Sequence, residues 1–535
     1  MKRAAQQTGP SAKSRKSDNE YSGYVVKNGD GVFSVSNINT FRQKYIDARK
    51  PCKLNCPPPV AIEKFRIDSI VDTLKYDEPL QVERKEKYGF GSGKTREHLK
   101  LSEIVEKLKS SDDSYYLTTQ YDENEGNEDD SDEDDEDDDE DDEDDDEEDG
   151  PTFPPATKKS KKDGADSDEE SESESESESE SGSGPAPSAH EAMIRQQLAR
   201  LNEEIEHFER TGEMNFGKKG GGAFDDEFGG PSGFLHDDET DYRVGSLYQP
   251  PLSGLVKDAA FPVTPAPFKN LVTQQINLWM GSSKQTKEKP DLLNPTVESL
   301  GKYVPEGNSS GLHHDHADNL YVVVQGRKRF TLYSPKDAAS LYTVGNINKV
   351  YANGLIDYKV DKNARLWRPM TENGAIKAVW AEWVLENVID TDFEVEEVEE
   401  MMMNEPRYKG DYDASIDPPS FSRVPPILAH LDEVTDAKEA QALEKFADKE
   451  FPGFRKLQKL EVWLKPGEML YVPTGWFHEV TSYADGDNSA HVALNWWFMP
   501  PSGKVNSFCP YKDEYWLFDW KETKAAINKA RKEKK

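Results

Sequence analysis

The stretch SSGLHHDHADNLYVVVQGRKRFTLYSP, at residues 309–335, decides how the rest of the chain is interpreted. It gathers histidines and aspartates directly in front of an apolar, β-branched segment at residues 320–324. Gly326 interrupts that segment, and residues 330–333 resume the pattern. The pattern predicts two strands joined by a short polar turn, with candidate metal ligands at the mouth of this hairpin.

A second stretch, EVWLKPGEMLYVPTGWFHEVTSY at residues 461–483, offers His478 at the start of another β-rich run. In the first stretch, His313-x-Asp315 and His316-x-Asp318 both place two ligands on one side of an extended chain. Spacing alone does not choose between these pairs. A third ligand must come from a strand that is adjacent in space and remote in sequence, which His478 can supply.

Two neutral imidazoles and one carboxylate can occupy one face of Fe(II) and leave the opposite positions open. An isolated His-x-Asp is more often an ordinary surface feature, but here two β-rich stretches carry ligands together. Zinc is the alternative metal. The carboxylate and the presence of only three cysteines favour a harder metal.

At these residues the chain resembles the JmjC-domain oxygenases, which are cupin-fold enzymes that use Fe(II), 2-oxoglutarate and O2. The resemblance covers QINLWMG (275–281), GLHHDHADN (311–319), GRKR (326–329), YVPTGWFH (471–478) and LNWW (494–497). It implies a mainly β fold with flanking helices, built on a double-stranded β-helix (jelly-roll or cupin) barrel. The register of the family motif implies that His313, Asp315 and His478 are the catalytic metal ligands.

The same resemblance implies roles for five further residues. Lys328 is similar to the lysine that pairs with the distal carboxylate of 2-oxoglutarate, where a cation suits a dicarboxylate held at its other end by a metal. Tyr116 and Ser310 resemble hydroxyl partners of that carboxylate. Asn319 and Asn495 resemble polar residues that line the pocket near the metal.

Composition restricts the partners and the compartment. The 535 residues carry a formal charge of −37 and are only 34% hydrophobic, so much of the chain is expected to lie outside a packed core. The negative charge disfavours direct binding of nucleic acid and favours a basic protein partner, such as a histone or a ribosomal protein. Three cysteines indicate a reducing compartment, the nucleus or the cytoplasm or both. No apolar run is long enough to span a membrane.

Changes in composition predict the organisation of the chain, with long acidic inserts that are expected to be disordered interrupting the barrel. The predicted segments are a disordered basic tail (1–20), the N-terminal part of the JmjC domain (21–121), an acidic low-complexity insert with a short helix near 189–210 (122–241), the catalytic barrel with inserts near 282–308 and 370–455 (242–500), and a helical, basic C-terminal tail (501–535). In the N-terminal part, residues 82–116 are expected to form a strand, a turn, a helix with Leu99 on its apolar face, and a second strand.

The expected function is hydroxylation of a protein side chain by a 2-oxoglutarate-dependent dioxygenase. The ligand set alone does not separate this reaction from demethylation of N-methyl-lysine or N-methyl-arginine on histones. The chain lacks the cysteine clusters of reader domains that often accompany histone demethylases, which favours hydroxylation. A non-catalytic JmjC scaffold that binds basic proteins through its acidic arm is the alternative from another class.

Overall fold

The computed structural model describes residues 20–31, 33–85, 88–91, 95–120, 239–283, 288–388, 391–413, 415–484, 489–503 and 510–532. The predicted basic tail lies outside the described residues except for Glu20, and the acidic insert with its short helix lies outside them except for its last three positions. Those three positions begin a helix, α5 (Glu239–Leu247).

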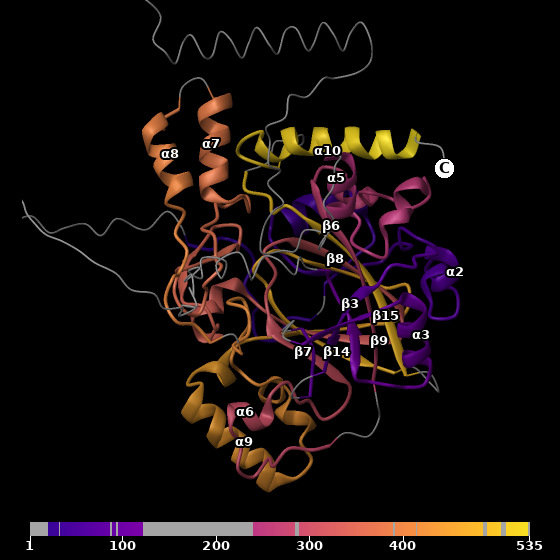
Figure 1. Cartoon of the computed structure of the whole chain (residues 1–535). Helices are drawn as coiled ribbons and strands as arrows, with labels where there is room; N and C mark the ends of the chain where they lie inside the picture. The colour runs from indigo at the N-terminus through magenta and orange to yellow at the C-terminus, as the bar shows by residue number, and fades with distance from the viewer. Residues whose placement is uncertain are drawn as a thin grey trace, which may run out of the picture. The chain divides into compact units, whose positions relative to one another are not determined.

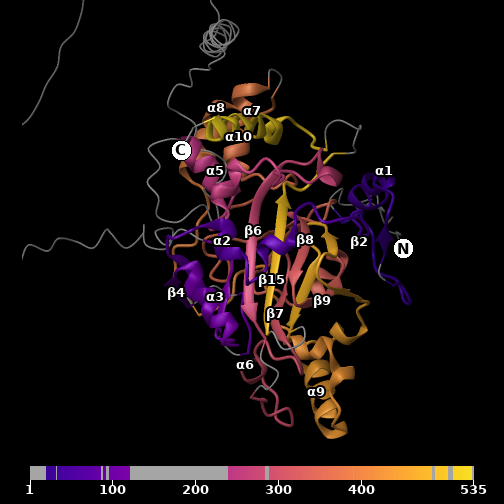
Figure 2. The same cartoon turned by 90° about the vertical axis from the view of Figure 1, so that its right-hand side faces the viewer.

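Two β-sheets form the centre of the described part of the chain (Figures 1 and 2). The larger sheet has the order β1 (Ser34–Val35), β2 (Cys52–Leu54), β13 (Met469–Val472), β8 (Asp318–Gln325), β15 (Ala490–Phe498), β6 (Thr273–Ser282), β5 (Tyr115–Leu117), β3 (Leu80–Arg84), β4 (Arg96–Leu99). The smaller sheet has the order β12 (Leu460–Leu464), β9 (Arg327–Tyr333), β14 (Phe477–Tyr483), β7 (Asn308–His313), and β10 (Ile347–Val350) pairs separately with β11 (Ile356–Tyr358). All these pairs are antiparallel except β1 with β2.

The two sheets face each other across a shared hydrophobic core. On β8, Tyr321 and Val323 point into this core and meet Phe330 and Leu332 of β9. The alternate residues of β8, such as Val322, join a second core on the outer face of the larger sheet. Because both faces of β8 are buried, its sequence is a continuous apolar run rather than an alternating one. This arrangement confirms the predicted β-helix barrel.

The prediction of a hairpin at residues 320–333 is wrong. β8 belongs to the larger sheet and β9 to the smaller one, so the chain crosses between the sheets at Gly326. Gly326 has a φ of +75°, and a Cβ added there would lie 2.8 Å from the Cβ of His491. A glycine therefore satisfies both the backbone conformation and the close approach of β15.

Most helices of the described residues are short, although the last one has 18 residues. They are α1 (Ile38–Phe41), which continues into a π-helical turn (Arg42–Ile46), α2 (Ile70–Leu74), α3 (Leu101–Lys109), α5, α6 (Val297–Leu300), α7 (Lys377–Asn387), α8 (Val395–Met403), α9 (Ala437–Glu450) and α10 (Tyr515–Lys532). The 3-10 turns are η2 (Ile62–Phe65), η4 (Ser253–Lys257), η5 (Ala266–Phe268), η6 (Pro335–Ser340), η7 (Pro426–Ala429), η8 (Leu431–Glu433) and η9 (Phe454–Lys456). In both views α7, α8 and α10 lie beyond one end of the sheets, and α6 and α9 lie beyond the other.

The N-terminal part differs from the prediction in one detail. Leu99 belongs to strand β4 and not to the following helix, so two strands, β3 and β4, stand where one was expected before α3. The helix begins at Leu101, where the Glu103 carboxylate accepts a hydrogen bond from the Lys100 backbone N–H at 2.8 Å. This side chain satisfies one N–H that precedes the first turn and marks the helix start.

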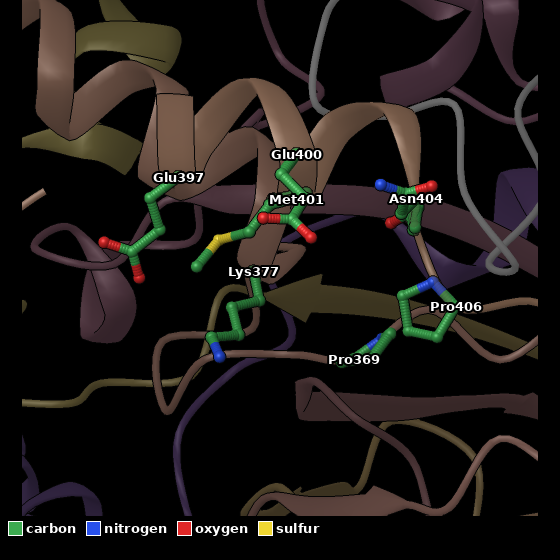
Figure 3. Close-up of a pocket in the computed structure, with 9 residues that line it drawn as sticks. Pro369, Lys377, Glu397, Glu400, Met401, Asn404 and Pro406 are labelled. Carbon is green, nitrogen blue, oxygen red and sulfur yellow. The ribbon is translucent and has the colours of Figure 1, made fainter. Parts of the chain in front are cut away.

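The insert near residues 370–455 carries an acidic helical pair, α7 and α8. Between the two helices lies a cavity of about 350 Å³ (Figure 3), where Glu397, Glu400 and Met401 of α8 and Lys377 of α7 line one space. In the part of the chain that the structure describes, no helix combines the length and the apolar character needed to cross a bilayer.

Candidate active site

The three predicted metal ligands lie together at one end of the smaller sheet. His313 is the last residue of β7, and it pairs in register with His478 of β14. The centroids of the two imidazole rings are 4.4 Å apart. Asp315 follows β7 by two residues, and its Oδ2 is 3.7 Å from Nε2 of His478. One ligand atom from each residue lies within 4.8 Å of the other two, a spacing that a single metal ion can bridge.

Backbone carbonyl groups orient both imidazoles. The Nδ1–H of His313 donates to the Gly311 carbonyl at 3.0 Å, and that of His478 donates to the Trp476 carbonyl at 2.9 Å. A carbonyl only accepts, so each Nδ1 carries a proton, and in the neutral ring this leaves the lone pair on Nε2. Burial, reinforced by the neighbouring His478, lowers the pKa of His313 well below its ordinary value. The ring is therefore held in the neutral form that metals bind.

A chain of amide hydrogen bonds orients the carboxylate ligand. Asn319 of β8 donates to Oδ2 of Asp315 at 3.1 Å, and Asn495 of β15 donates to Oδ1 of Asn319 at 3.2 Å. The indole N–H of Trp279, on β6, donates to Oδ1 of Asn495 at 2.9 Å. Three neighbouring strands of the larger sheet thus fix the position of Asp315. Such outer hydrogen bonds usually tune metal affinity.

The alternative pair, His316 and Asp318, is already committed to other contacts. The carboxylate of Asp318 is fully buried and forms an ion pair with Arg49. It also accepts hydrogen bonds from the Tyr471 hydroxyl at 2.7 Å and from the Thr474 N–H at 3.0 Å. These contacts occupy both carboxylate oxygens, so Asp318 serves as a structural anchor. Among the described residues, only the set of His313, Asp315 and His478 forms a potential metal site.

A cavity of about 300 Å³ opens over these ligands. Aromatic side chains from both sheets and the insert form much of its wall: Phe90, Tyr116, Trp279, Phe330, Phe421 and Trp497. Phe421 comes from the insert near residues 370–455, and its ring stacks on His313 with a centroid distance of 4.9 Å. The ammonium of Lys302 lies 4.7 Å from the Phe421 centroid. The insert therefore shapes the space next to the metal ligands.

The structure places Lys328 behind the wall of this cavity. The side chain is fully buried, and its ammonium donates to Ser482 Oγ at 2.6 Å and to His491 Nδ1 at 3.1 Å. Ser482 and His491 both line the cavity. Desolvation by burial lowers the pKa of Lys328 to about 7. The ammonium also lies 5.7 Å from the ring centroid of Tyr116.

The two predicted hydroxyl partners differ in their surroundings. Tyr116 of β5 lines the cavity and stacks on Phe90 with a centroid distance of 5.0 Å. Burial raises the pKa of its phenol, so the hydroxyl stays protonated. Ser310 also lines the cavity, but its hydroxyl donates to the Gly311 carbonyl at 2.9 Å and accepts from the Val480 N–H at 3.1 Å. These contacts stabilise the irregular pairing between β7 and β14.

Comparison with known proteins identifies the family. A family model described as a cupin-like domain matches residues 95–504 of the chain. JmjC domain-containing protein 4 of Schizosaccharomyces pombe (strain 972) is 31% identical over 333 residues, which are 52% of this chain and 65% of that protein. The chain belongs to the cupin-like JmjC family. Proteins of this family are typically oxygenases that use Fe(II) and 2-oxoglutarate.

Two further JmjC relatives match shorter segments. Lysine-specific demethylase JMJ32 of Arabidopsis thaliana is 28% identical over 190 residues, 35% of this chain and 38% of that protein. The human tRNA wybutosine-synthesizing protein 5 is 36% identical over 86 residues, 16% of this chain and 27% of that protein. The chain covers less than two thirds of the length of each of these relatives.

Sequence reasoning missed two residues of the JmjC pocket, Ser482 and His491. Both could have been found by the two-residue repeat of a strand. Ser482 lies four positions after His478 on β14, and His491 lies four positions before Asn495 on β15. Each therefore faces the same side of its strand as a residue that the family motif had already selected.

Proposed function

We propose that this protein is an Fe(II)- and 2-oxoglutarate-dependent dioxygenase that hydroxylates a protein side chain. The convergence of His313, Asp315 and His478, with Nδ1 of both imidazoles donating to backbone carbonyls, is the observation that carries the proposal. The donor set fits Fe(II), because two imidazoles and one carboxylate leave positions open for a cosubstrate and oxygen. Membership of the JmjC family supports the same chemistry.

When bound, the metal supplies the oxidising chemistry in which 2-oxoglutarate, O2 and a C–H bond become succinate, CO2 and a C–OH group. The residues of the chain prepare the site for it. Asn319 holds the carboxylate of Asp315, and Phe421 covers one face of His313. Lys328 places a cationic group where the distal carboxylate of 2-oxoglutarate can be neutralised.

The test is succinate formation from 2-oxoglutarate by the full chain, with and without Fe(II). We expect His313→Ala to abolish iron-dependent succinate formation, whereas His98→Ala, which alters an exposed histidine on β4, retains it. Equal succinate formation by the wild type and His313→Ala would reject the oxygenase proposal. It would then support the alternative of a scaffold that binds basic proteins.

Hydroxylation and demethylation are separated by their products. The names of relatives such as lysine-specific demethylase JMJ32 make demethylation the second candidate. Mass spectrometry of basic proteins captured with the active enzyme distinguishes a gain of one oxygen from the loss of a methyl group with release of formaldehyde. We expect the added oxygen, because the three cysteines of the chain cannot form the cysteine clusters of attached reader domains. Histones and ribosomal proteins, in a nuclear or cytoplasmic setting, are the first substrates to test, since the chain carries a formal charge of −37.

A further inference from the structure

The buried ammonium of Lys328 faces neutral hydrogen-bond partners. Its partners in the described part of the chain are the Ser482 hydroxyl and the His491 imidazole. An ammonium has three N–H groups, and these contacts use two of them. A buried cation is costly unless a charge or a set of hydrogen bonds compensates it. The arrangement is therefore suited to an anion that enters from the cavity.

His491 offers a second donor at this end of the cavity. Its side chain is fully buried on β15, and it lines the cavity together with Asn495 and Trp497 of the same strand. Its Nδ1 accepts from Lys328, so its Nε2 carries the proton. This buried Nε2 has no hydrogen-bond partner among the described residues. Because a buried donor without an acceptor is costly, the Nε2–H indicates a ligand that accepts a hydrogen bond there.

The His491 ring packs closely against the backbone of β6 at Gly281, which has no side chain. A Cβ added to Gly281 would lie 2.7 Å from Cε1 of His491 and 2.6 Å from Cδ2 of Tyr116. The centroids of the His491 and Tyr116 rings are 5.8 Å apart. Glycine at this position lets both rings approach the backbone of β6, so the imidazole has little freedom to move.

We propose that His491 is a cosubstrate-binding residue that donates from Nε2 to the distal carboxylate of 2-oxoglutarate, beside Lys328 and Ser482. This inference rests on the proposed function. Three side chains near this end of the cavity offer donors: Lys328 its third N–H, Ser482 its hydroxyl proton, and His491 its Nε2–H on the other edge of the ring from Lys328. Ser482 can donate because its oxygen already accepts from Lys328.

The experiment is calorimetric binding to the full chain loaded with Mn(II), which binds the cosubstrate without turnover. The two probes are 2-oxoglutarate and 2-oxopentanoate, which carries a methyl group in place of the distal carboxylate. We expect His491→Phe to weaken 2-oxoglutarate about tenfold or more, as for the loss of a hydrogen bond to a charged group. The affinity for 2-oxopentanoate should stay unchanged.

Two further variants separate binding from packing. His491→Asn keeps a polar atom near the Nδ1 position for Lys328 but removes the Nε2 donor, so it should show the same selective loss. Gly281→Ala should also weaken 2-oxoglutarate, because it displaces the His491 ring. Mn(II) affinity, which depends on the three ligands, should be retained in the His491 variants and serves as the control for folding.

The outcomes distinguish this inference from the proposed function. Unchanged binding of 2-oxoglutarate by His491→Phe, or equal losses for both probes, would overturn the role of His491 and leave the oxygenase proposal intact. If the wild type loaded with Mn(II) does not bind 2-oxoglutarate, the proposed function fails, and the role of His491 fails with it.

Discussion

His313 and His478 occupy directly paired positions on neighbouring antiparallel strands, which brings their ring centroids to within 4.4 Å. Because the strands are paired, the position of each imidazole relative to the other is set by the register of β7 and β14. We predict that His313→Ala and His478→Ala each reduce the affinity for Mn(II) or Fe(II) by more than about 100-fold, beyond the effect usual for an outer hydrogen bond. Equilibrium dialysis measures this, with His98→Ala as the control. Retention of full affinity in either ligand variant would contradict the site.

The chain of hydrogen bonds from Trp279 to Asp315 predicts graded effects of substitutions on metal affinity. Asn319→Ala removes the direct donor to Asp315 and should lower the metal affinity by about 10-fold to 100-fold. Trp279→Phe removes only the last donor of the chain and should have a smaller effect. Metal titrations of both variants and the wild type provide the comparison. An effect of Trp279→Phe equal to or larger than that of Asn319→Ala would show that the chain does not act through Asp315.

The lowered pKa of Lys328 predicts a pH dependence of cosubstrate binding. In the free protein the ammonium loses its proton near pH 7, because burial disfavours the charged form. A bound dicarboxylate favours the protonated amine, so the affinity for 2-oxoglutarate should be constant below pH 7 and should fall as the pH rises above it. Calorimetry from about one pH unit below this pKa to about two units above it, roughly pH 6 to pH 9, follows the change.

Other groups near Lys328 should not produce this dependence. Burial lowers the pKa of His491 and raises that of Tyr116, so both stay neutral between pH 7 and pH 9, and Ser482 does not titrate. Lys328→Met should bind 2-oxoglutarate weakly and without the decline above pH 7. The same decline in this variant would assign the titration to another group.

The ion pair between Arg49 and Asp318 predicts a stability effect that is separate from catalysis. Arg49→Met leaves the fully buried Asp318 carboxylate without its cation and should lower the free energy of unfolding by about 3–5 kcal/mol. The double variant Arg49→Met, Asp318→Asn should recover part of this loss, because it removes the unpaired charge. Urea unfolding curves measure both values. Equal stability of the single variant and the wild type would show that the pair does not support the fold.

Local patterns in the sequence predicted much of the fold. The apolar runs predicted strands, and α3 lies where a helix was expected within residues 82–116. The partner sheet of each strand was not predictable, as β8 and β9 show. A hairpin and a crossing between two sheets have the same local signature, namely two strands with a glycine between them.

The site was predicted only in part, because the sequence does not show which remote residues contact each candidate ligand. Spacing left two His-x-Asp pairs open, and the resemblance to a family selected one. The reason that Asp318 is not a metal ligand is visible only in three dimensions, since Arg49, which forms an ion pair with it, lies 269 residues away in the chain. By contrast, His491 was within reach of the sequence, because the alternation of β15 relates it to Asn495.

The pairing of His313 with His478 also has a consequence for biosynthesis. The ribosome makes two of the three ligands long before β14 exists, so a nascent chain cannot assemble the candidate metal site until synthesis has passed residue 478. Closing this long-range contact costs chain entropy and occurs late in folding. On the proposed function, loading with iron should therefore report that a newly made molecule has completed its tertiary structure.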